Sequence, residues 1–334
     1  MIALSDIETT LAAFPRVALG HWPTPLEPTD RLRAERGGPR IWLKRDDCSG
    51  LAFGGDKTRK LEFLLGEALT EGATGVMTFG ALQSNHCRQT AAASARVGLP
   101  CHLILTTQVE RDDAHYVGSG NRLLDDVLGA TVHVVADNDA ALVRCGELLD
   151  ADPGLAVIGP GGSSPVGTLG YVAAGIELAA QLRDAAVDPA AVVVASSTGG
   201  TAAGLLVGLE MGGAPAPVRA VAVYADAATT RATIEYLAAE TASLVSAPAP
   251  NLARLTVDDS MLGAGYGIET DASHAAVDVL ARTEGVLLDP VYTAKAFAFL
   301  LASSEIDTDD DVVFVHTGGQ TGLFAYADAF ASTS

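Results

Sequence analysis

The chain is organised around LAFGGDKTRKLEFLL, residues 51–65, which we interpret together with QSNH at residues 83–86. Its centre is Lys57, which follows two glycines and precedes apolar residues at helical spacing. Glycines let a backbone approach a ligand closely. A lysine at such a turn can form a Schiff base with an aldehyde cofactor when desolvation lowers its pKa. The same position also suits a phosphate-binding lysine or an ordinary helix start, so this stretch alone leaves those alternatives open.

Length and composition indicate a compact α/β enzyme. The 334 residues can form two lobes, and 49% hydrophobic residues with 35 glycines are not typical of a disordered chain. The net charge of −20 argues against binding nucleic acid through a basic patch. Because no run of about 18 uncharged apolar residues appears, we expect no membrane-spanning helix and no membrane partner.

Several features of the chain predict a cytoplasmic location. The first residues carry acids and no basic segment, so we expect no secretory signal. The four cysteines show no CxxC spacing and are expected to be reduced thiols rather than disulfides or a zinc site. No HExxH or EF-hand spacing predicts a metal site. Only four of the 21 basic residues are lysines, which fits either a salt-rich cytoplasm or a genome that favours arginine.

Residues 75–158 alternate short apolar strands with helices. Such an alternation predicts a parallel sheet covered on both faces. The expected strands are 75–80, 101–106, 131–135 and 156–158, and the expected helices are 85–97, 120–128 and 140–149. Further on we expect a helix at 169–183, strands at 191–195, 218–224 and 312–315, and helical structure in 225–260. The predicted fold is α/β, with two open twisted parallel-sheet domains: a large domain of residues 1–59 and 165–334, and a small inserted domain of residues 60–164.

A strand followed by SSTGGT, residues 196–201, and then a helix has the features of a phosphate cradle. Backbone N–H groups at a helix N-terminus suit a phosphate monoester, and the hydroxyls can add donors. A tight strand-to-helix turn would have the same sequence. The chain lacks the GxxxxGK[ST] spacing of an ATP-type loop, and no GxGxxG opens its first strand.

Further polar residues are expected at the carboxyl edge of the sheet, where ligands of open α/β sheets bind. Asn85 can hydrogen-bond a ring hydroxyl, and Ser84 can hold a substrate carboxylate or simply cap a helix. His86 is either part of this group or a surface histidine. Tyr266 and Tyr292 are candidates for a proton donor or a ring-stacking wall, although either alone is more often a packed tyrosine.

Taken together, these segments resemble a known enzyme family. FGGDKTRKLEFLL with GALQSNHCRQTAAASARVGL resembles the D-cysteine desulfhydrase and 1-aminocyclopropane-1-carboxylate (ACC) deaminase family, which uses pyridoxal 5′-phosphate (PLP) on the tryptophan synthase β-type fold. The resemblance continues in order through GNRLLDDVLGA, GGSSPVGTLGY, SSTGGTAAGL, GAGYGI, LDPVYTAKA and VHTGGQTGLFAY. It implies a PLP site in the cleft between the two domains, a small amino-acid substrate and a homodimer.

The resemblance also implies roles for the matched residues. Lys57 corresponds to the Schiff-base lysine and Lys60 to the lysine near the cofactor phosphate. Asn85 corresponds to the partner of the pyridine 3′-oxygen, and Ser84, Asn85 and His86 resemble the loop that binds the substrate carboxylate. The phosphate loop is matched by Thr198, Gly199, Gly200 and Thr201. The two active-site tyrosines are matched by Tyr266 and Tyr292.

Two departures from ACC deaminases favour the desulfhydrase branch. Thr293 stands where those enzymes typically carry a glutamate facing the pyridine nitrogen, and His86 stands where they typically carry glutamine. A hydroxyl holds the pyridine proton less well than a carboxylate, so the electron sink is weaker. Thr317, after the last strand, is a second candidate for the pyridine nitrogen, and the sequence does not separate it from Thr293.

The sequence therefore predicts a PLP-dependent lyase that eliminates sulfide from D-cysteine and yields pyruvate and ammonia. ACC deamination and desulfonation of L-cysteate are alternatives on the same fold and cofactor. A PLP-binding protein with little catalysis and a sugar- or nucleotide-phosphate binder without PLP are alternatives of other classes. The handedness of the substrate is not specified by the sequence.

Overall fold

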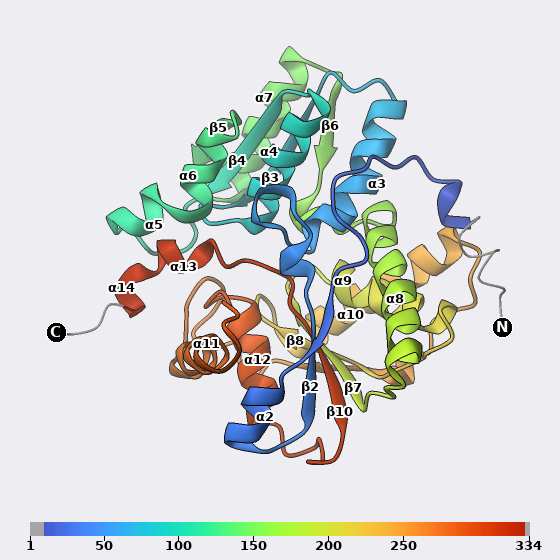
Figure 1. Ribbon diagram of the computed structural model, residues 1–334. Helices are drawn as coiled ribbons and strands as arrows, with labels where there is room; N and C mark the ends of the chain where they lie inside the picture. Colours follow the sequence, from blue (N-terminus) through green and yellow to red (C-terminus); the bar gives the residue numbers. More distant parts are fainter. Residues whose placement is uncertain (1–9, 331–334) are drawn as a thin grey trace.

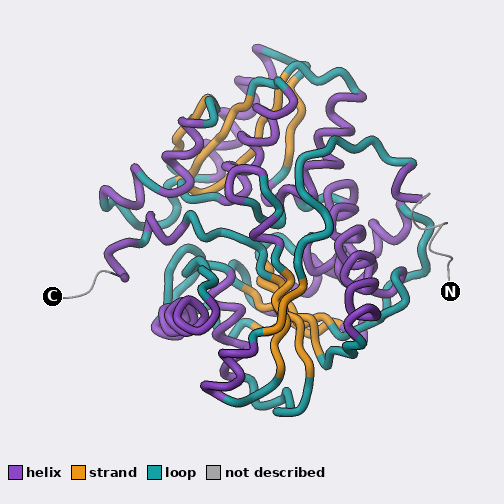
Figure 2. The backbone as a smooth tube through the Cα atoms, viewed as in Figure 1, coloured by secondary structure: helices purple, strands orange, loops and turns teal. Residues whose placement is uncertain are grey.

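The computed structural model describes residues 10–330, which form two sheets flanked by helices (Figures 1 and 2). The larger sheet has six strands in the order β1-β2-β10-β7-β8-β9. Its strands are β1 (Leu26–Pro28), β2 (Arg40–Lys44), β7 (Ala191–Ser196), β8 (Val218–Ala222), β9 (Leu255–Asp258) and β10 (Asp311–Val315). Strand β1 runs antiparallel to β2, and the other neighbouring pairs are parallel.

Helices cover both faces of this sheet because its central strands are apolar on both sides. In β7, Val192 and Val194 pack into one core cluster, whereas Ala191 and Val193 pack into another. The period of two along a strand sends alternate side chains to opposite faces. The first cluster lies under α8 (Pro165–Ala185), α9 (Gly200–Met211) and α10 (Ala227–Leu244), and the second under α2 (Asp30–Arg36), α11 (Asp271–Glu284) and α12 (Thr293–Ala302).

The smaller sheet is all parallel, in the order β5-β4-β3-β6. Its strands are β3 (Gly75–Ala81), β4 (Cys101–Thr106), β5 (Thr131–Val135) and β6 (Leu155–Ile158). The helices around it are α3 (Lys57–Thr70), α4 (Asn85–Val97), α5 (Ala114–Gly118), α6 (Gly120–Val127) and α7 (Asn138–Ala151). The last segment of the chain, with α13 (Gly322–Ala325) and α14 (Ala327–Phe330), returns to this sheet, where α13 contacts α5 and α6.

The structure confirms the α/β class with two open sheets, which are parallel except for the edge strand β1. The predicted helix 85–97 and the predicted strands 101–106 and 131–135 have the observed bounds. Helix α8 begins earlier than predicted, at Pro165, because the Ser164 hydroxyl caps it and proline suits the first helical turn. The proposed domain boundaries remain a prediction, although the sheets themselves are built from separate stretches of the chain.

The prediction of helical structure throughout residues 225–260 is wrong. Helix α10 occupies the first half, but the chain then turns and adds β9 to the edge of the larger sheet. Strand β9 has four residues, of which Leu255 alone is buried, so it carries too little apolar pattern to be seen in the sequence. Helices α2 and α5 were also not predicted, because both are short and α2 is mostly polar.

Within residues 10–330 no helix combines the length and apolar character needed to cross a bilayer. Residues 1–9, on which the expectation about a secretory signal partly rests, lie outside the described residues.

Candidate active site

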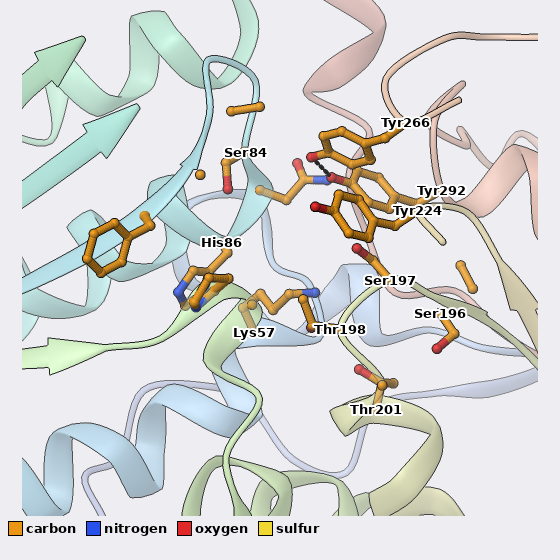
Figure 3. A pocket seen from close by; sticks show the side chains of 18 of the residues that line it. Lys57, Ser84, His86, Ser196, Ser197, Thr198, Thr201, Tyr224, Tyr266 and Tyr292 are labelled. Carbon is orange, nitrogen blue, oxygen red and sulfur yellow. Dashed lines mark hydrogen bonds between the residues drawn. The ribbon is translucent and has the colours of Figure 1, made fainter. Parts of the chain in front are cut away.

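A cavity of about 520 Å³ lies where strand ends of the two sheets meet. Strands β3 and β4 contribute residues from the smaller sheet, and the residues that end β7 or follow β10 contribute from the larger sheet. This is the carboxyl edge at which ligands of parallel sheets bind. The predicted site residues that line it are Lys57, Ser84, Asn85, His86, Thr198, Gly199, Thr201, Tyr266, Tyr292 and Thr317 (Figure 3).

Lys57 is the first residue of α3, and its amine enters the cavity beside a buried carboxylate. Its Nζ lies 2.7 Å from both oxygens of Asp56, which also accepts a hydrogen bond from the Thr201 hydroxyl at 2.8 Å. Burial would raise the pKa of Asp56, but the nearby Lys57 and Lys60 outweigh it and hold that pKa below its usual range. The sequence analysis missed Asp56, although this residue directly precedes Lys57.

Lys60 lies one helical turn further on, behind the cavity wall. It is buried, and its Nζ donates to the Gly161 carbonyl and the Ser163 hydroxyl, both at 3.2 Å. Among residues 10–330 no carboxylate forms an ion pair with it. Burial, with a smaller contribution from Lys57, lowers the pKa of Lys60 to about 7. A buried ammonium without a carboxylate is suited to an anionic ligand.

The turn between β7 and α9 adds the backbone donors of a helix N-terminus. Gly199 caps α9 with φ of +79°, and the helix starts at Gly200. A Cβ atom at Gly200 would lie 3.2 Å from Nζ of Lys60 and 2.7 Å from Oγ of Ser163. The Ser163 and Thr198 hydroxyls are 2.7 Å apart. Helix donors, hydroxyls and an ammonium therefore converge in a space that a side chain would fill, as a phosphate site requires.

Asn85, the first residue of α4, has a fixed amide orientation. Its Oδ1 accepts from Arg88 at 3.2 Å and from the Asn121 amide at 2.9 Å. The Asn85 amide nitrogen is left as a donor without a partner among residues 10–330. A donor held in this way fits an anionic ring oxygen. Arg88 and Asn121, which are both fully buried, were not singled out from the sequence.

Ser84 and His86 flank Asn85. The Ser84 hydroxyl caps α4 by accepting from the Cys87 backbone N–H at 3.2 Å, so Ser84 is both a cap and a cavity residue. His86 is buried rather than on the surface, and its Nε2 lies 2.8 Å from the Thr78 hydroxyl. Burial, reinforced by Lys57 and Lys60, lowers the pKa of His86 to about 3. His86 is therefore neutral and does not offer a positive charge to a substrate carboxylate.

Three tyrosines form the opposite wall (Figure 3). The hydroxyls of Tyr266 and Tyr292 are 2.5 Å apart, and the Tyr224 ring meets Tyr266 edge-on with 5.2 Å between centroids. Burial raises the pKa of Tyr266 to about 12 and raises that of Tyr292 well above its usual value, so both phenols keep their protons. Tyr224 follows β8 at the same sheet edge, and that position was the signal by which the sequence could have identified it.

The two candidate threonines lie in different environments. Thr317 lines the cavity, and its hydroxyl forms no hydrogen bond with another residue of 10–330. Thr293 is fully buried at the start of α12 and is not among the cavity-lining residues. Its hydroxyl donates to Oδ1 of Asp289 at 2.7 Å and accepts from the Asp289 backbone N–H at 2.8 Å. The structure thus places Thr317 at the cavity and pairs the Thr293 hydroxyl with Asp289, whose carboxylate accepts the backbone N–H groups of Tyr292 and Thr293.

These residues fit PLP. Lys57 offers an amine for the aldehyde, and the Thr198–Thr201 turn with Lys60 offers donors and positive charge for the phosphate. Asn85 offers a donor for the phenolic oxygen, and Thr317 offers a hydroxyl for the ring nitrogen.

Comparisons with known proteins agree with this fit. A family model described as "Pyridoxal-phosphate dependent enzyme" matches residues 17–318. A D-cysteine desulfhydrase of Salmonella paratyphi A is 41% identical over 95% of this chain and 97% of its own length, and one of Salmonella schwarzengrund is 40% identical over the same shares.

Solved structures give the same result for the fold. A crystal structure described as an ACC deaminase homologue matches with a TM-score of 0.87 and 36% identity over 98% of each chain. A crystal structure of a threonine deaminase from T.th. is 20% identical with a TM-score of 0.66 over 95% of this chain and 98% of its own, which supports the fold alone. On the residues of its cavity and on the match over residues 17–318, the chain belongs to the family of pyridoxal-phosphate dependent enzymes.

Proposed function

We propose that this chain catalyses the β-elimination of D-cysteine, in which D-cysteine and water give pyruvate, ammonia and hydrogen sulfide. The choice of this reaction rests on one observation, namely that the cavity wall formed by residues 10–330 has no free carboxylate. Among the described residues, the only carboxylate that lines the cavity is Asp56, and Lys57 and Thr201 already bind it. Relatives about 40% identical over nearly their whole length are named D-cysteine desulfhydrases.

The lack of a free carboxylate favours elimination over ring opening. A carboxylate beside the pyridine nitrogen would stabilise the protonated ring and strengthen the electron sink, whereas the Thr317 hydroxyl does so less well. Sulfide is a good leaving group and asks less of the cofactor than opening a cyclopropane does. The same lysine, phosphate turn and tyrosine pair would serve either substrate, so the charge of the wall separates the two reactions.

The side chains then take distinct tasks. Bound PLP supplies an electron sink for the electron pair left at Cα. Lys57 would hold the cofactor, and its side chain, when it is a free amine, can take the Cα proton. The Ser84 hydroxyl and the N-terminus of α4 hold the substrate carboxylate. Neutral His86 supports this loop through Thr78 without adding charge.

The tyrosine pair is the source of a proton for the leaving group. Tyr266 and Tyr292 share a hydrogen bond, and burial keeps both phenols protonated at neutral pH. A phenol that donates to the departing sulfur lets it leave as hydrosulfide or hydrogen sulfide rather than as a bare dianion.

Product identification tests the proposal most directly. D-cysteine, ACC and L-cysteate are offered separately, each at low and high salt. We expect pyruvate and sulfide from D-cysteine at a rate well above that of any product from the other two. Formation of 2-oxobutanoate from ACC at a comparable rate, or of sulfite from L-cysteate, would overturn the choice of substrate and leave the family intact.

Borohydride reduction separates a PLP enzyme from a phosphate binder. Only a cofactor bonded to a lysine becomes fixed to the chain, so a peptide that contains Lys57 and has gained the mass of reduced PLP is expected. Failure to trap PLP on any of the four lysines would contradict the proposed role of Lys57.

We further propose that the protein is a cytoplasmic homodimer whose small domain comprises residues 60–164. Support comes from the family resemblance and from four free cysteines. Analytical ultracentrifugation tests the dimer, because a monomer at micromolar concentration would contradict it.

A further inference from the structure

Lys295 is a fully buried lysine in the first turn of α12. Its ammonium donates to the backbone carbonyls of Leu262 at 2.7 Å and Gly265 at 3.4 Å. No carboxylate among residues 10–330 forms an ion pair with it. An ammonium buried with carbonyl partners alone is costly to the fold, so its presence calls for a reason other than stability.

The two carbonyls belong to the loop that carries Tyr266. In this loop, Gly263, Gly265 and Gly267 have φ values of +68°, +144° and +78°, so Tyr266 stands between two glycines in the left-handed region. Glycines of this kind restrict the backbone little. Partners outside the loop therefore help to set its conformation. The Tyr326 hydroxyl donates to the Gly267 carbonyl at 2.7 Å, and the Lys295 ammonium binds the carbonyl immediately before Tyr266.

The other tyrosine lies on the element that carries Lys295. Tyr292 is the N-cap residue of α12, and its backbone N–H donates to Asp289 at 2.8 Å. Lys295 follows three residues later, on the same rigid helix end. One helix end therefore fixes Tyr292 and, through the Lys295 ammonium, also fixes the loop of Tyr266.

We propose that Lys295 is a positioning residue whose ammonium clamps the 262–267 loop against α12 and thereby keeps the Tyr266 and Tyr292 hydroxyls together at the cavity. The proposal rests on the proposed function only in giving the tyrosine pair a chemical task. The clamp itself is a statement about the loop and can be tested without any substrate.

The charges around Lys295 also predict its titration. Burial lowers its pKa to about 8, against the raising effect of Asp289 and Glu269. The amine stays a donor when it loses its proton, but its hydrogen bonds to the carbonyls become weaker because they are no longer assisted by charge. The clamp is therefore expected to loosen as the pH rises through about 8.

A double-mutant cycle tests the clamp in the active enzyme. Lys295→Met removes the ammonium at similar volume, and a small displacement of a catalytic group can lower the rate by about 100-fold. If Lys295 acts through Tyr266, then Lys295→Met has little further effect on kcat in a Tyr266→Phe background. Two losses that simply multiply would overturn the proposal.

Hydrogen–deuterium exchange gives a readout independent of activity. We expect faster exchange at residues 262–268 in Lys295→Met, both with and without PLP, and no change at the glycine turn 37–38. Lys295→Gln, which keeps an N–H donor, is expected to be intermediate and serves if the methionine variant does not fold. Unchanged loop exchange in both variants would overturn the clamp. Absence of sulfide production by the unsubstituted enzyme would instead overturn the proposed function.

Discussion

Buried lysine and arginine side chains occur in two regions of this molecule, and the two regions differ in the hydrogen-bond partners of these side chains. The first region, which we call the Glu177 network, consists of Thr24, Lys44, Asp46, Arg59 and Glu177. In it, the Arg59 guanidinium donates to the carboxylates of Asp46 and Glu177 at 2.9–3.0 Å. Lys44 is paired there with Glu177. Behind the residues that line the cavity, Lys60 and Lys295 are equally buried, but both donate only to carbonyl and hydroxyl oxygens.

We interpret the cations that are paired with carboxylates as stabilising the fold, and the cations without such a pair as serving function. In the Glu177 network each cation has a carboxylate, so desolvation is offset by attraction within the protein. Lys60 and Lys295 form no ion pair with a described carboxylate, although Asp56 lies near the first and Asp289 and Glu269 near the second. For Lys60 we expect an anionic ligand to be the partner, and for Lys295 the partners are the carbonyls of the 262–267 loop. All four lysines of the chain lie in one of these two regions, whereas the surface ion pairs use arginine, as in Arg31–Glu35 and Arg282–Asp278.

The largest effect is expected from Lys57→Ala, which tests the region around the cavity. We expect turnover to become undetectable, because no other amine lines the cavity among the described residues. The melting temperature should fall but the variant should still fold, because the buried Asp56 loses its ion-pair partner and keeps the Thr201 hydroxyl. Activity against D-cysteine is measured beside thermal unfolding. Full activity with a folded variant would refute the assignment of Lys57.

The corresponding test of the Glu177 network is Glu177→Gln. The substitution leaves Lys44 and Arg59 with one carboxylate instead of two, and breaking a buried ion pair costs about 3–5 kcal/mol. Urea unfolding measures that loss, and kcat per folded molecule should be unchanged. Glu35→Gln, which breaks an exposed pair, is the control and should cost at most about 0.5 kcal/mol. Equal losses of unfolding free energy in the two variants would show that the Glu177 network stabilises the fold no more than a surface ion pair does.

The sequence was informative where the pattern is local or where a family motif covers the residue. The short apolar strands and the capped helix at 85–97 could be predicted from such patterns, and most of the residues assigned from the resemblance line the cavity. What could not be predicted depends on partners brought together in space. The pairing of Asp56 with Lys57 and the support of Asn85 by Asn121 are of this kind.

Lys60→Met tests whether the Lys60 ammonium binds the cofactor phosphate. A hydrogen bond between charged groups contributes about 1.5–3 kcal/mol, so the affinity for PLP should fall by about 10- to 100-fold. Equilibrium dialysis of PLP measures this change. Unaltered affinity would mean that the turn at Thr198–Thr201 holds the phosphate without Lys60.

The cofactor-free protein offers a second measurement on the same variant. The pKa of Lys60 is about 7 in the native state, against an ordinary value of 10.5. Between these pH values the unfolded chain binds more protons than the native one, so this lysine makes the free energy of unfolding rise with pH. The rise should be smaller in Lys60→Met than in the unsubstituted protein. Parallel curves for the two proteins would show that Lys60 is not perturbed by burial.

The smallest expected effect comes from a matched pair of threonines. Thr317→Val removes a hydroxyl at the cavity, and the loss of one neutral hydrogen bond of about 1–1.5 kcal/mol predicts a drop of about tenfold in kcat/KM. Thr293→Val removes the bond to Asp289 and should cost about 1 kcal/mol of stability with little effect on kcat, because that hydroxyl binds Asp289 and does not line the cavity. The reverse result, with the larger kinetic effect at Thr293, would place the pyridine nitrogen at α12 and make the Asp289 cap part of the active site.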